Sequence, residues 1–467
     1  MQATCPDEKY RDGKKAFENA TKAYQLDGGK RCSFIDTLAA AYAEGGDFTH
    51  AAEWQEKAIQ LMESDKSVTK TFMEEMRSRL ELYKAKKPYR DIGLGRKDAV
   101  DHKERANAHY KAGDMDKAIA DYSKAIEINP RSSVAYNSRG NAYDSQGDTD
   151  KAIADYTKAI ELDPKGAVLF SNRGKSFCQK GDLDRALADL ARAVELDPKH
   201  ATAYYNRALV YGEKGAYEKA IADYSKAIEL DPKFTLAYNG RGLAYSKKGD
   251  TNKEMADYDE AILLDPKFVQ AYYNRGVLHQ NKKEWDAAIA DYTETVRLSP
   301  KLSIAYNGRG YVYFKRRAWD KSLADFSEAV RLDPQNVNMI CNVAHVRCQM
   351  GKLDDALADC NRAVELAPDN SVCLRARGFI YLEKGALDKA LSDWNKAVEV
   401  AKTPAGRGTS KFARSVALAK KGELEKARTD YQEARKDEPK GEEFYLESAG
   451  PKGQAALAEV VKPLKGE

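Results

Sequence analysis

The sequence predicts an all-α fold, a right-handed α-solenoid of helix-turn-helix repeats with a 34-residue period. Three observations lead to this prediction. Prolines recur at a spacing of 34 residues, and each interval between them carries two helical patterns, which a glycine separates in most intervals. The composition also fits, because 42% of the 467 residues are hydrophobic. The chain can therefore bury the core of an array of about thirteen and a half units.

Prolines set the length of the repeat. Eight of them are 34 residues apart, and the next two follow at 36 and 35 residues. They are Pro130, Pro164, Pro198, Pro232, Pro266, Pro300, Pro334 and Pro368, followed by Pro404 and Pro439. Because proline has no amide hydrogen and clashes with the preceding helical turn, each one predicts the end of a helix and the start of the next unit.

The interval 133–166 shows how one unit is built. Apolar or small residues at i, i+4 and i+7 predict one face of each of two helices. They are Tyr136, Gly140 and Tyr143 in the first helix, and Ala152, Tyr156 and Ala159 in the second. Between them, Gly147 can adopt the positive φ that ends a helix, and Asp148 is a suitable N-cap for the helix that follows. Repeat positions are counted below from Ser133 and its equivalents.

The same 34-residue spacing predicts how the rest of the chain is divided. We expect a partial repeat with only its second helix (1–31), a repeat (32–65), an irregular helical spacer (66–98), eight regular repeats (99–370), two slightly longer-spaced repeats (371–441) and a C-terminal cap or tail (442–467). Ala16, Ala20 and Ala23 carry the spacing of a second helix without a first. We therefore expect a fragment of a longer protein, or a degenerate first repeat.

This pattern resembles the tetratricopeptide repeat (TPR) family, whose 34-residue unit has aromatic, small and proline residues at matching places. The resemblance covers 99–441 strongly and 32–65 clearly. In the earlier stretch the matching residues are Leu38, Ala39, Tyr42, Gly46, Ala51 and Ala58. It implies a non-enzymatic scaffold for protein–protein interaction, which binds an extended peptide or a helix of another protein in a concave groove lined by the first helices.

The chain departs from the family at positions 7 and 23, where Arg and Asp recur together in nine units. The arginines are Arg105, Arg139, Arg173, Arg207, Arg241, Arg275, Arg309, Arg377 and Arg414, and each Asp follows sixteen residues later, from Asp121 to Asp430. We expect an ion-pair ladder that ties helix to helix. A phosphate-binding ladder is the alternative, although the Asp partners would compete for the guanidinium groups.

A row of asparagines occupies position 5 or 6 of the first helices. The candidates for holding the backbone of a peptide are Asn172, Asn206, Asn239, Asn274 and Asn307, with Asn137 and Asn342 at equivalent places. An Asn side chain offers both donors and an acceptor, so a regular row can bind main chain regardless of sequence. The row is similar to the asparagine ladder in the TPR part of the O-linked N-acetylglucosamine transferases. Alternatively, these side chains bond to the adjacent helix.

Large aromatic residues fall at other groove positions in the C-terminal half. The candidates for binding apolar side chains of a partner are Tyr205 and Tyr273 at position 5, Tyr311 and Phe379 at position 9, and Phe314 at position 12. Exposed aromatic residues in a concave surface are typical of partner sites. The alternative is that the superhelix or the C-terminal cap folds over them.

Other kinds of site find less support. Cys341, His345 and Cys348 lie at i, i+4 and i+7, a spacing that suits zinc or copper, but cysteine is also a small apolar core residue. We assign no metal and no cofactor, and leave this cluster open. No catalytic motif is present in the sequence, so we assign no catalytic residue.

Composition narrows the class of partner. The net charge is only +4 and both signs are interspersed, which argues against nucleic acid. No apolar run is long enough to insert into a membrane. Seven cysteines without a CxxC pair favour reduced thiols and a cytoplasmic location. Self-association remains possible. The alternative function is a substrate-recruiting or regulatory arm of a larger enzyme with its catalytic domain upstream.

Residues 235–334 deviate most from the regular pattern, and we expect local loosening there. The deviations are Glu254 and Ser322 in place of Ala at position 20, Lys283 and Arg317 in place of Gly at position 15, and His279 in place of Tyr at position 11.

Overall fold

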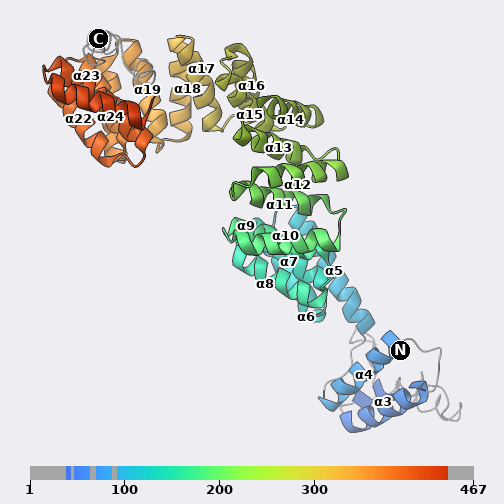
Figure 1. Ribbon diagram of the computed structural model, residues 1–467. Coiled ribbons are helices and arrows are strands. Elements are labelled where there is room, and N and C mark those ends of the chain that lie inside the picture. The colour runs from blue at the N-terminus through green and yellow to red at the C-terminus, as the bar shows by residue number, and fades with distance from the viewer. Residues whose placement is uncertain (1–37, 41, 44–46, 64–69, 87–91, 440–467) are drawn as a thin grey trace. The chain divides into compact units, whose positions relative to one another are not determined.

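The computed structural model describes residues 38–40, 42–43, 47–63, 70–86 and 92–439. All regular secondary structure in these ranges is α-helical, and the helices follow one another in antiparallel pairs (Figure 1). The predicted fold class is confirmed: the chain is an all-α solenoid of helix-turn-helix repeats with a 34-residue period. The partial repeat expected at 1–31 and the tail expected at 442–467 lie outside the described residues, and the domain boundaries stay predictions.

The chain divides into two compact units, Met1–Val210 and Tyr211–Glu467. In the first, the described helices up to the boundary are α3 (Phe48–Glu63), α4 (Lys70–Lys84), α5 (Ile92–Lys111), α6 (Met115–Ile128), α7 (Ser133–Gln146), α8 (Thr149–Leu162), α9 (Ala167–Gln179) and α10 (Leu183–Leu196). The boundary falls inside α11 (Ala201–Glu213). Arg207 and Asp223 therefore belong to different units.

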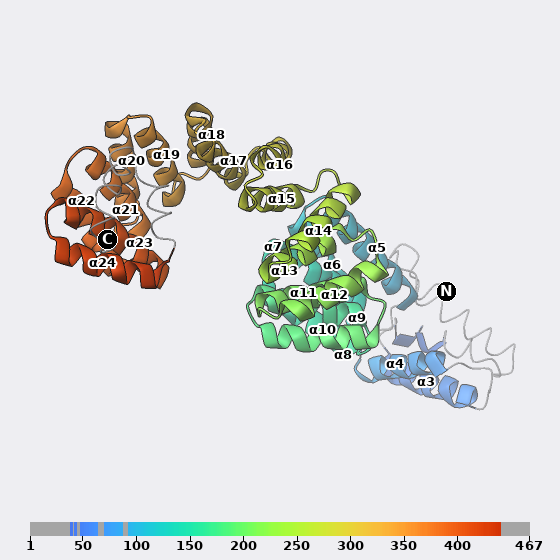
Figure 2. The ribbon, with the colours of Figure 1, turned by 45° about the horizontal axis from the view of Figure 1, so that its top comes forward.

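The second unit continues the same alternation of first and second helices, which Figure 2 shows from another side. Its helices are α12 (Tyr217–Leu230), α13 (Thr235–Lys248), α14 (Thr251–Leu264), α15 (Val269–Asn281), α16 (Trp285–Leu298), α17 (Ser303–Lys315), α18 (Trp319–Leu332), α19 (Val337–Gln349), α20 (Leu353–Leu366), α21 (Ser371–Glu383), α22 (Leu387–Val400), α23 (Pro404–Lys420) and α24 (Leu424–Asp437).

The turn between the two helices of a repeat follows the predicted chemistry. Gly147 ends α7 with a φ of 83°, which a residue without Cβ adopts freely. The carboxylate of Asp148 then accepts a hydrogen bond from the backbone N–H of Lys151 and caps α8. The second helices α6, α10 and α14 are capped in the same way, by Asp114, Asp182 and Asp250 respectively.

Close contact between the two helices of a repeat requires small residues at the crossing point. Ala152 and Ala159 are fully buried, and the ring of Tyr156 lies against α7. A Cβ atom added at Gly140 would stand only 2.7 Å from that ring. The glycine of the first helix and the tyrosine of the second are therefore fitted to each other, and a larger residue at 140 would separate the helices.

Two turns in the deviant stretch keep the glycine conformation without glycine. Lys283 and Arg317 have φ of 61° and 58°, the left-handed region that Gly147 and Gly249 occupy in other repeats. The backbone of the turn is thus set by the repeat geometry and not by the residue at position 15. For a residue with a side chain this conformation costs roughly 1–2 kcal/mol.

Candidate functional site

Within each unit, several successive first helices lie side by side. In addition to the contacts within each repeat, first helices of successive repeats touch directly: α7 with α9, α13 with α15, α15 with α17, α17 with α19, α19 with α21, and α21 with α23. No second-helix pair among the described residues makes a comparable contact. First helices therefore line the inner side of the curve within each unit. We call the surface formed by positions 2, 5, 6, 9, 12 and 13 the first-helix face.

The asparagines on this face bond to one another across repeats. The side-chain amide of Asn172 donates to the side-chain oxygen of Asn137 over 2.9 Å. The same bond, also 2.9 Å, joins Asn274 to Asn239 and Asn342 to Asn307. In every pair the acceptor occupies position 5 of one repeat and the donor position 6 of the next. The slip between positions 5 and 6 is therefore the register that neighbouring first helices need to pair their amides.

Asn206 does not follow this arrangement. It is buried and donates to the hydroxyl of Ser171 over 3.3 Å. Its amide therefore has less surface to offer a ligand than those of the three pairs. In the pairs, the amide nitrogen of Asn239 and the amide oxygen of Asn274 make no further hydrogen bond among the described residues. Each of these pairs keeps a donor and an acceptor for a partner.

Three of the predicted aromatic residues are half-buried on this side of the second unit. The Tyr273 ring packs against Tyr292 at 5.9 Å between centroids. The Phe314 ring lies edge-on to Trp319 at 5.3 Å, and Tyr311 packs against the same small core. Each ring therefore packs against side chains of its own repeat and leaves part of its surface exposed to solvent. Tyr205, in the first unit, is also half-buried, and this raises the pKa of its hydroxyl.

Phe379 does not belong to an exposed surface, and the prediction that it binds a partner needs correction. It is only 2% exposed and packs edge-on against Trp394, with centroids 5.5 Å apart. It is part of a core that also contains Phe412. The same repeat position is exposed further upstream, so the repeat position alone does not decide exposure. We exclude Phe379 from the candidate surface.

A row of exposed aliphatic residues on the first-helix face escaped the sequence analysis. Position 2 carries Val134, Val168, Leu236, Ile304 and Val372, and position 9 carries Leu209 and Leu243. Leu243 is 47% exposed. The sequence does carry a signal for this row, since position 2 is apolar in alternate repeats from Val168 onward. These side chains extend the apolar surface beside the asparagine pairs.

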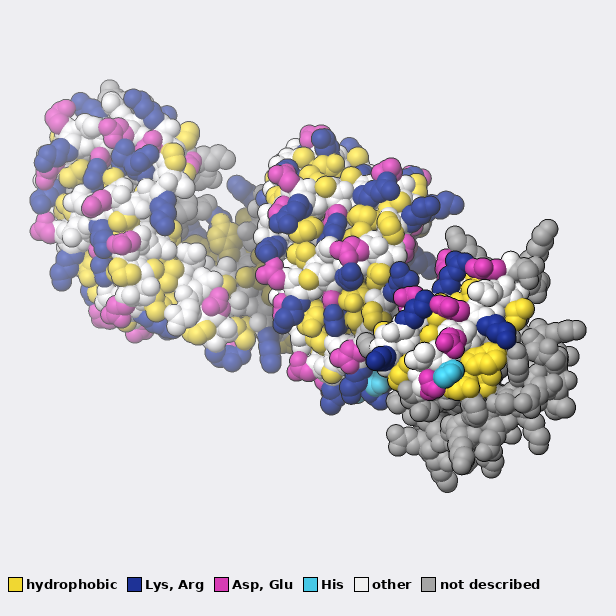
Figure 3. Space-filling model, turned by 90° about the horizontal axis from the view of Figure 1, so that it is seen from below, with side chains coloured by type: hydrophobic (Ala, Val, Ile, Leu, Met, Phe, Trp, Pro, Cys, Tyr) yellow, Lys and Arg dark blue, Asp and Glu magenta, His cyan; other side chains and the backbone are white. Residues whose placement is uncertain are grey.

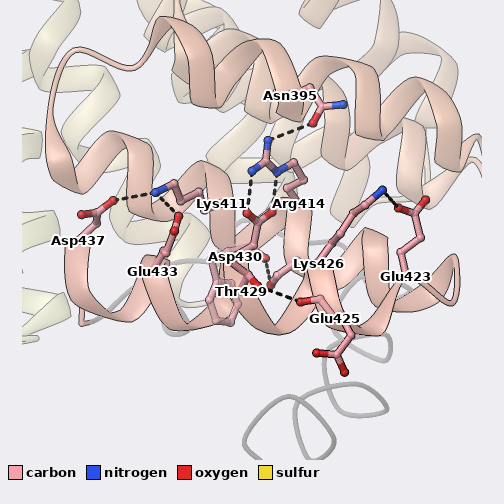
Figure 4. A network of polar contacts seen from close by, with 12 residues as sticks. Asn395, Lys411, Arg414, Glu423, Glu425, Lys426, Thr429, Asp430, Glu433 and Asp437 are labelled. Atoms are coloured by element: carbon pink, nitrogen blue, oxygen red, sulfur yellow. Dashed lines mark hydrogen bonds and ion pairs between the residues drawn. The ribbon is translucent and has the colours of Figure 1, made fainter.

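The arginine ladder is confirmed as structural in the eight pairs that lie within one unit. Figure 4 shows the last of them: Arg414 donates to both oxygens of Asp430, over 2.5 and 2.7 Å, and to the side-chain oxygen of Asn395 in the preceding repeat over 3.1 Å. All three nitrogens of the guanidinium group therefore already donate hydrogen bonds, two to the carboxylate and one to the amide oxygen. A phosphate would have to displace these partners, so the geometry opposes the phosphate alternative.

The Cys341, His345 and Cys348 cluster consists mainly of core residues. Both cysteines are buried in a cluster with Ala344 and Ile340. Burial raises the pKa of the Cys348 thiol to about 12 and lowers the pKa of His345 to about 4. Metals bind thiolates, and these thiols are held protonated. Among the described residues no group of three or more His, Cys, Asp or Glu side chains is arranged to hold a metal ion.

The electrostatic surface does not single out a charged ligand. On the side shown in Figure 3, Lys and Arg alternate with Asp and Glu, and apolar patches lie between them. Many of the surface charges are paired within one helix turn, as Lys158 is with Glu161. In the part of the chain that is described, no helix combines the length and apolar character needed to cross a membrane.

Comparison with protein families gives a single family. Models described as "TPR repeat" match residues 106–147, 174–215 and 209–249. Models described as "Tetratricopeptide repeat" match 133–165, 236–268, 257–290, 282–337 and 344–407. The chain belongs to the tetratricopeptide repeat family, as the repeat pattern predicted. Its repeats are those of a protein–protein interaction scaffold, a class that is typically non-catalytic. The search of curated proteins found no match to this sequence.

Several solved structures are similar to parts of the chain. The MamA protein is 29% identical over 36% of this chain and 93% of its own, with a TM-score of 0.32. YrrB, described as a TPR protein with an unusual peptide-binding site, is 23% identical over 39% of this chain and 95% of its own, also at 0.32. The Cut9–Hcn1 hetero-tetramer of the APC/C is 14% identical. The match covers 80% of this chain and 85% of that chain, with a TM-score of 0.47. At these TM-scores the likeness carries no argument about function.

Proposed function

We propose that this protein is a non-enzymatic scaffold that binds an extended peptide of another protein on the first-helix face of α13, α15 and α17. The observation that carries the proposal is the combination of exposed aliphatic side chains and asparagine pairs on the same helices. Leu236 and Leu243 lie on α13, and Ile304 on α17. The Asn239–Asn274 pair joins α13 to α15. Apolar groups and amides alternate along one side.

The two kinds of residue would perform different tasks. An extended peptide carries a backbone donor and acceptor at every residue, and the Asn239 nitrogen and Asn274 oxygen can bond to one of each. The aliphatic side chains and the exposed parts of Tyr273, Tyr311 and Phe314 would receive apolar side chains of the peptide. Because the rings are already packed against their own repeats, they lose little conformational freedom on binding. Affinity would come mostly from apolar contact, and the amides would fix orientation.

The proposal is tested by selecting binding peptides from a random displayed library and measuring Kd with variants of the full chain. We expect Leu243→Asp to weaken binding tenfold or more, because a charge replaces an apolar contact; a tenfold change corresponds to about 1.4 kcal/mol. Leu263→Asp is the matched control. Leu263 is 72% exposed on α14, the second helix of the same repeat, and lies outside the first-helix face.

Two further outcomes decide the assignment. Asn274→Ala should weaken every selected peptide to a similar degree if the amides bind main chain. Equal loss in Leu243→Asp and Leu263→Asp, or no loss in either, would show that the peptides bind elsewhere. Circular dichroism of each variant establishes that the helices are intact.

A further inference from the structure

The C-terminal ends of three neighbouring first helices are strongly basic. Charges of both signs alternate over the side drawn in Figure 3, but seven of the nine residues at positions 13, 14 and 15 of α13, α15 and α17 are Lys or Arg. We call these seven the basic rim: Lys247, Lys248, Lys282, Lys283, Lys315, Arg316 and Arg317. In α7 and α9 the same positions hold one basic residue, Lys180, and in α19 and α21 again one, Lys384.

The cations at position 14 of the rim are already neutralised. The ion pairs are Lys248 with Glu218 over 2.8 Å, Lys282 with Glu284 over 2.9 Å, and Arg316 with Asp286. Elsewhere in the array, Lys180 pairs with Asp150 and Lys384 with Asp354, both on the second helix of the preceding repeat. A cation at position 14 is therefore part of the repeat architecture and needs no ligand.

The cations at positions 13 and 15 differ from those at position 14. Lys247, Lys283 and Arg317 are exposed, and their charged groups form no ion pair or hydrogen bond with the described residues. The Lys315 ammonium nitrogen lies over the Tyr311 ring, 5.8 Å from its centroid. The rim therefore borders on the aromatic part of the first-helix face and leaves three charges for a partner.

Two of these three charges stand on strained backbone. Lys283 and Arg317 occupy position 15 with φ of 61° and 58°. Eight glycines, from Gly113 to Gly422, hold the equivalent place in other described repeats, where a residue without Cβ adopts positive φ freely. A cation near the end of a helix complements the helix dipole, but position 14 already supplies one. Strained residues cluster at functional sites, so these two side chains point to a task beyond the turn.

We infer that the peptide bound on the first-helix face of α13, α15 and α17 is acidic and that its carboxylate side chains contact Lys247, Lys283 and Arg317, an inference that rests on the proposed function of that face. Positive charges beside an apolar surface favour acidic partners, disfavour basic ones and speed up association. Packed helices lie roughly 8–10 Å apart, and an extended chain advances about 3.3 Å per residue. Acidic residues should therefore recur about every third position of the peptide.

A displayed library of random peptides tests the charge of the ligand. It is selected in parallel on the full-length wild type and on a rim variant with Lys247→Gln, Lys283→Gly and Arg317→Gly. The replacements are residues that other repeats carry at the same positions, such as Gln179 and Gly249. We expect the wild type to select peptides enriched in Asp and Glu and the rim variant to lose this enrichment. Because glycine relieves two strained turns, thermal stability should be unchanged or raised, which excludes a folding defect.

The matched control removes three charges from the opposite end of the same first helices. Lys233, Lys267 and Lys301 are exposed and precede α13, α15 and α17, and the control variant changes all three to Gln. At low ionic strength, a synthetic peptide of the selected sequence should bind the rim variant about tenfold more weakly than the wild type, and the control variant within about twofold. The same peptide with Gln in place of its acidic residues should bind the wild type and the rim variant equally.

The variants separate the acidic preference from the proposed function. Neutral peptides that bind the wild type and are lost in Leu243→Asp would leave the proposed function intact and overturn the acidic preference. Acidic peptides that are weakened in the rim variant but not in Leu243→Asp would support the rim and refute binding on the first-helix face. Equal weakening in the rim and control variants would show a general effect of charge and refute the rim. A library without any binder would count against both.

Discussion

At the scale of single residues, the arginine at position 7 connects three helices in several repeats. The Arg173 guanidinium donates to both oxygens of Asp189 in its own repeat, over 2.7 and 2.8 Å. Its remaining arm donates to the hydroxyl of Thr157 on the second helix of the preceding repeat, over 3.1 Å. Ser123, Ser225 and Thr293 serve the same purpose for Arg139, Arg241 and Arg309. Such charge-assisted bonds fix the register between repeats more than they add stability.

The first repeat of the regular array gives a pH prediction at this scale. Arg105 donates to both oxygens of Asp121, over 2.6 and 2.5 Å, and this holds the pKa of Asp121 at about 2. In the unfolded chain the pKa is about 3.9. The folded value is the lower one, so the stabilisation from this pair is complete above pH 4 and is lost as the pH falls toward 2.

The measurement is a carbon NMR titration of the aspartate carboxyl groups, with Asp121→Asn used to assign the signal. We expect a midpoint near pH 2 in the native protein and a higher midpoint in Arg105→Gln, because the guanidinium is gone and only His102 still hydrogen-bonds to the carboxylate. A native midpoint near pH 4 would show that the pair does not form in solution.

At the scale of the element, two of the turns between helices have a strained backbone conformation that a glycine would relieve. Lys283 and Arg317 hold the left-handed conformation that glycine adopts in the other repeats. We expect Lys283→Gly and Arg317→Gly each to stabilise the adjoining helices by about 1 kcal/mol, since glycine removes the Cβ clash. Backbone hydrogen exchange in α15–α18 should slow down.

A glycine in the same turn elsewhere provides the reverse control. Gly249 has a φ of 78°, so Gly249→Ala should speed up exchange in α13 and α14. If the two glycine substitutions leave exchange in α15–α18 unchanged, the turns relax in solution to a conformation without strain. The close crossing at Gly140 obeys a different rule, because there the limit is space beside Tyr156 and not backbone conformation.

At the scale of the whole molecule, stability should be local, because each repeat contacts its neighbours along the chain. Ala288 is fully buried where α16 meets α15. We expect Ala288→Leu to overpack this contact at a cost of about 1–3 kcal/mol. Exchange should accelerate in α15–α18 and stay unchanged in α7–α10 of the other unit.

The equivalent substitution in the first unit makes the comparison symmetrical. Ala152 is fully buried on α8, so Ala152→Leu should accelerate exchange in α7–α10 and leave α15–α18 unchanged. A response of both units to either substitution would mean that the array unfolds as one cooperative body, and the expectation of local stability would be wrong.

Features fixed within one repeat could be predicted from the sequence by itself. The 34-residue period, the paired helices, the Gly147 turn, the Asp148 cap and the Arg–Asp ladder all depend on residues close together in the chain. Such local patterns recur from unit to unit, and their repetition makes them recognisable in a single sequence. The tetratricopeptide family and the scaffold class follow from them.

Features that depend on a neighbouring repeat were decided only by the tertiary structure. The pairing of Asn274 with Asn239 needs the register between first helices, which one repeat does not contain. Phe379 and Leu243 occupy the same position and have opposite exposure. A repeat position specifies which way a side chain points, whereas burial depends on what lies opposite, and that is a property of the assembled array.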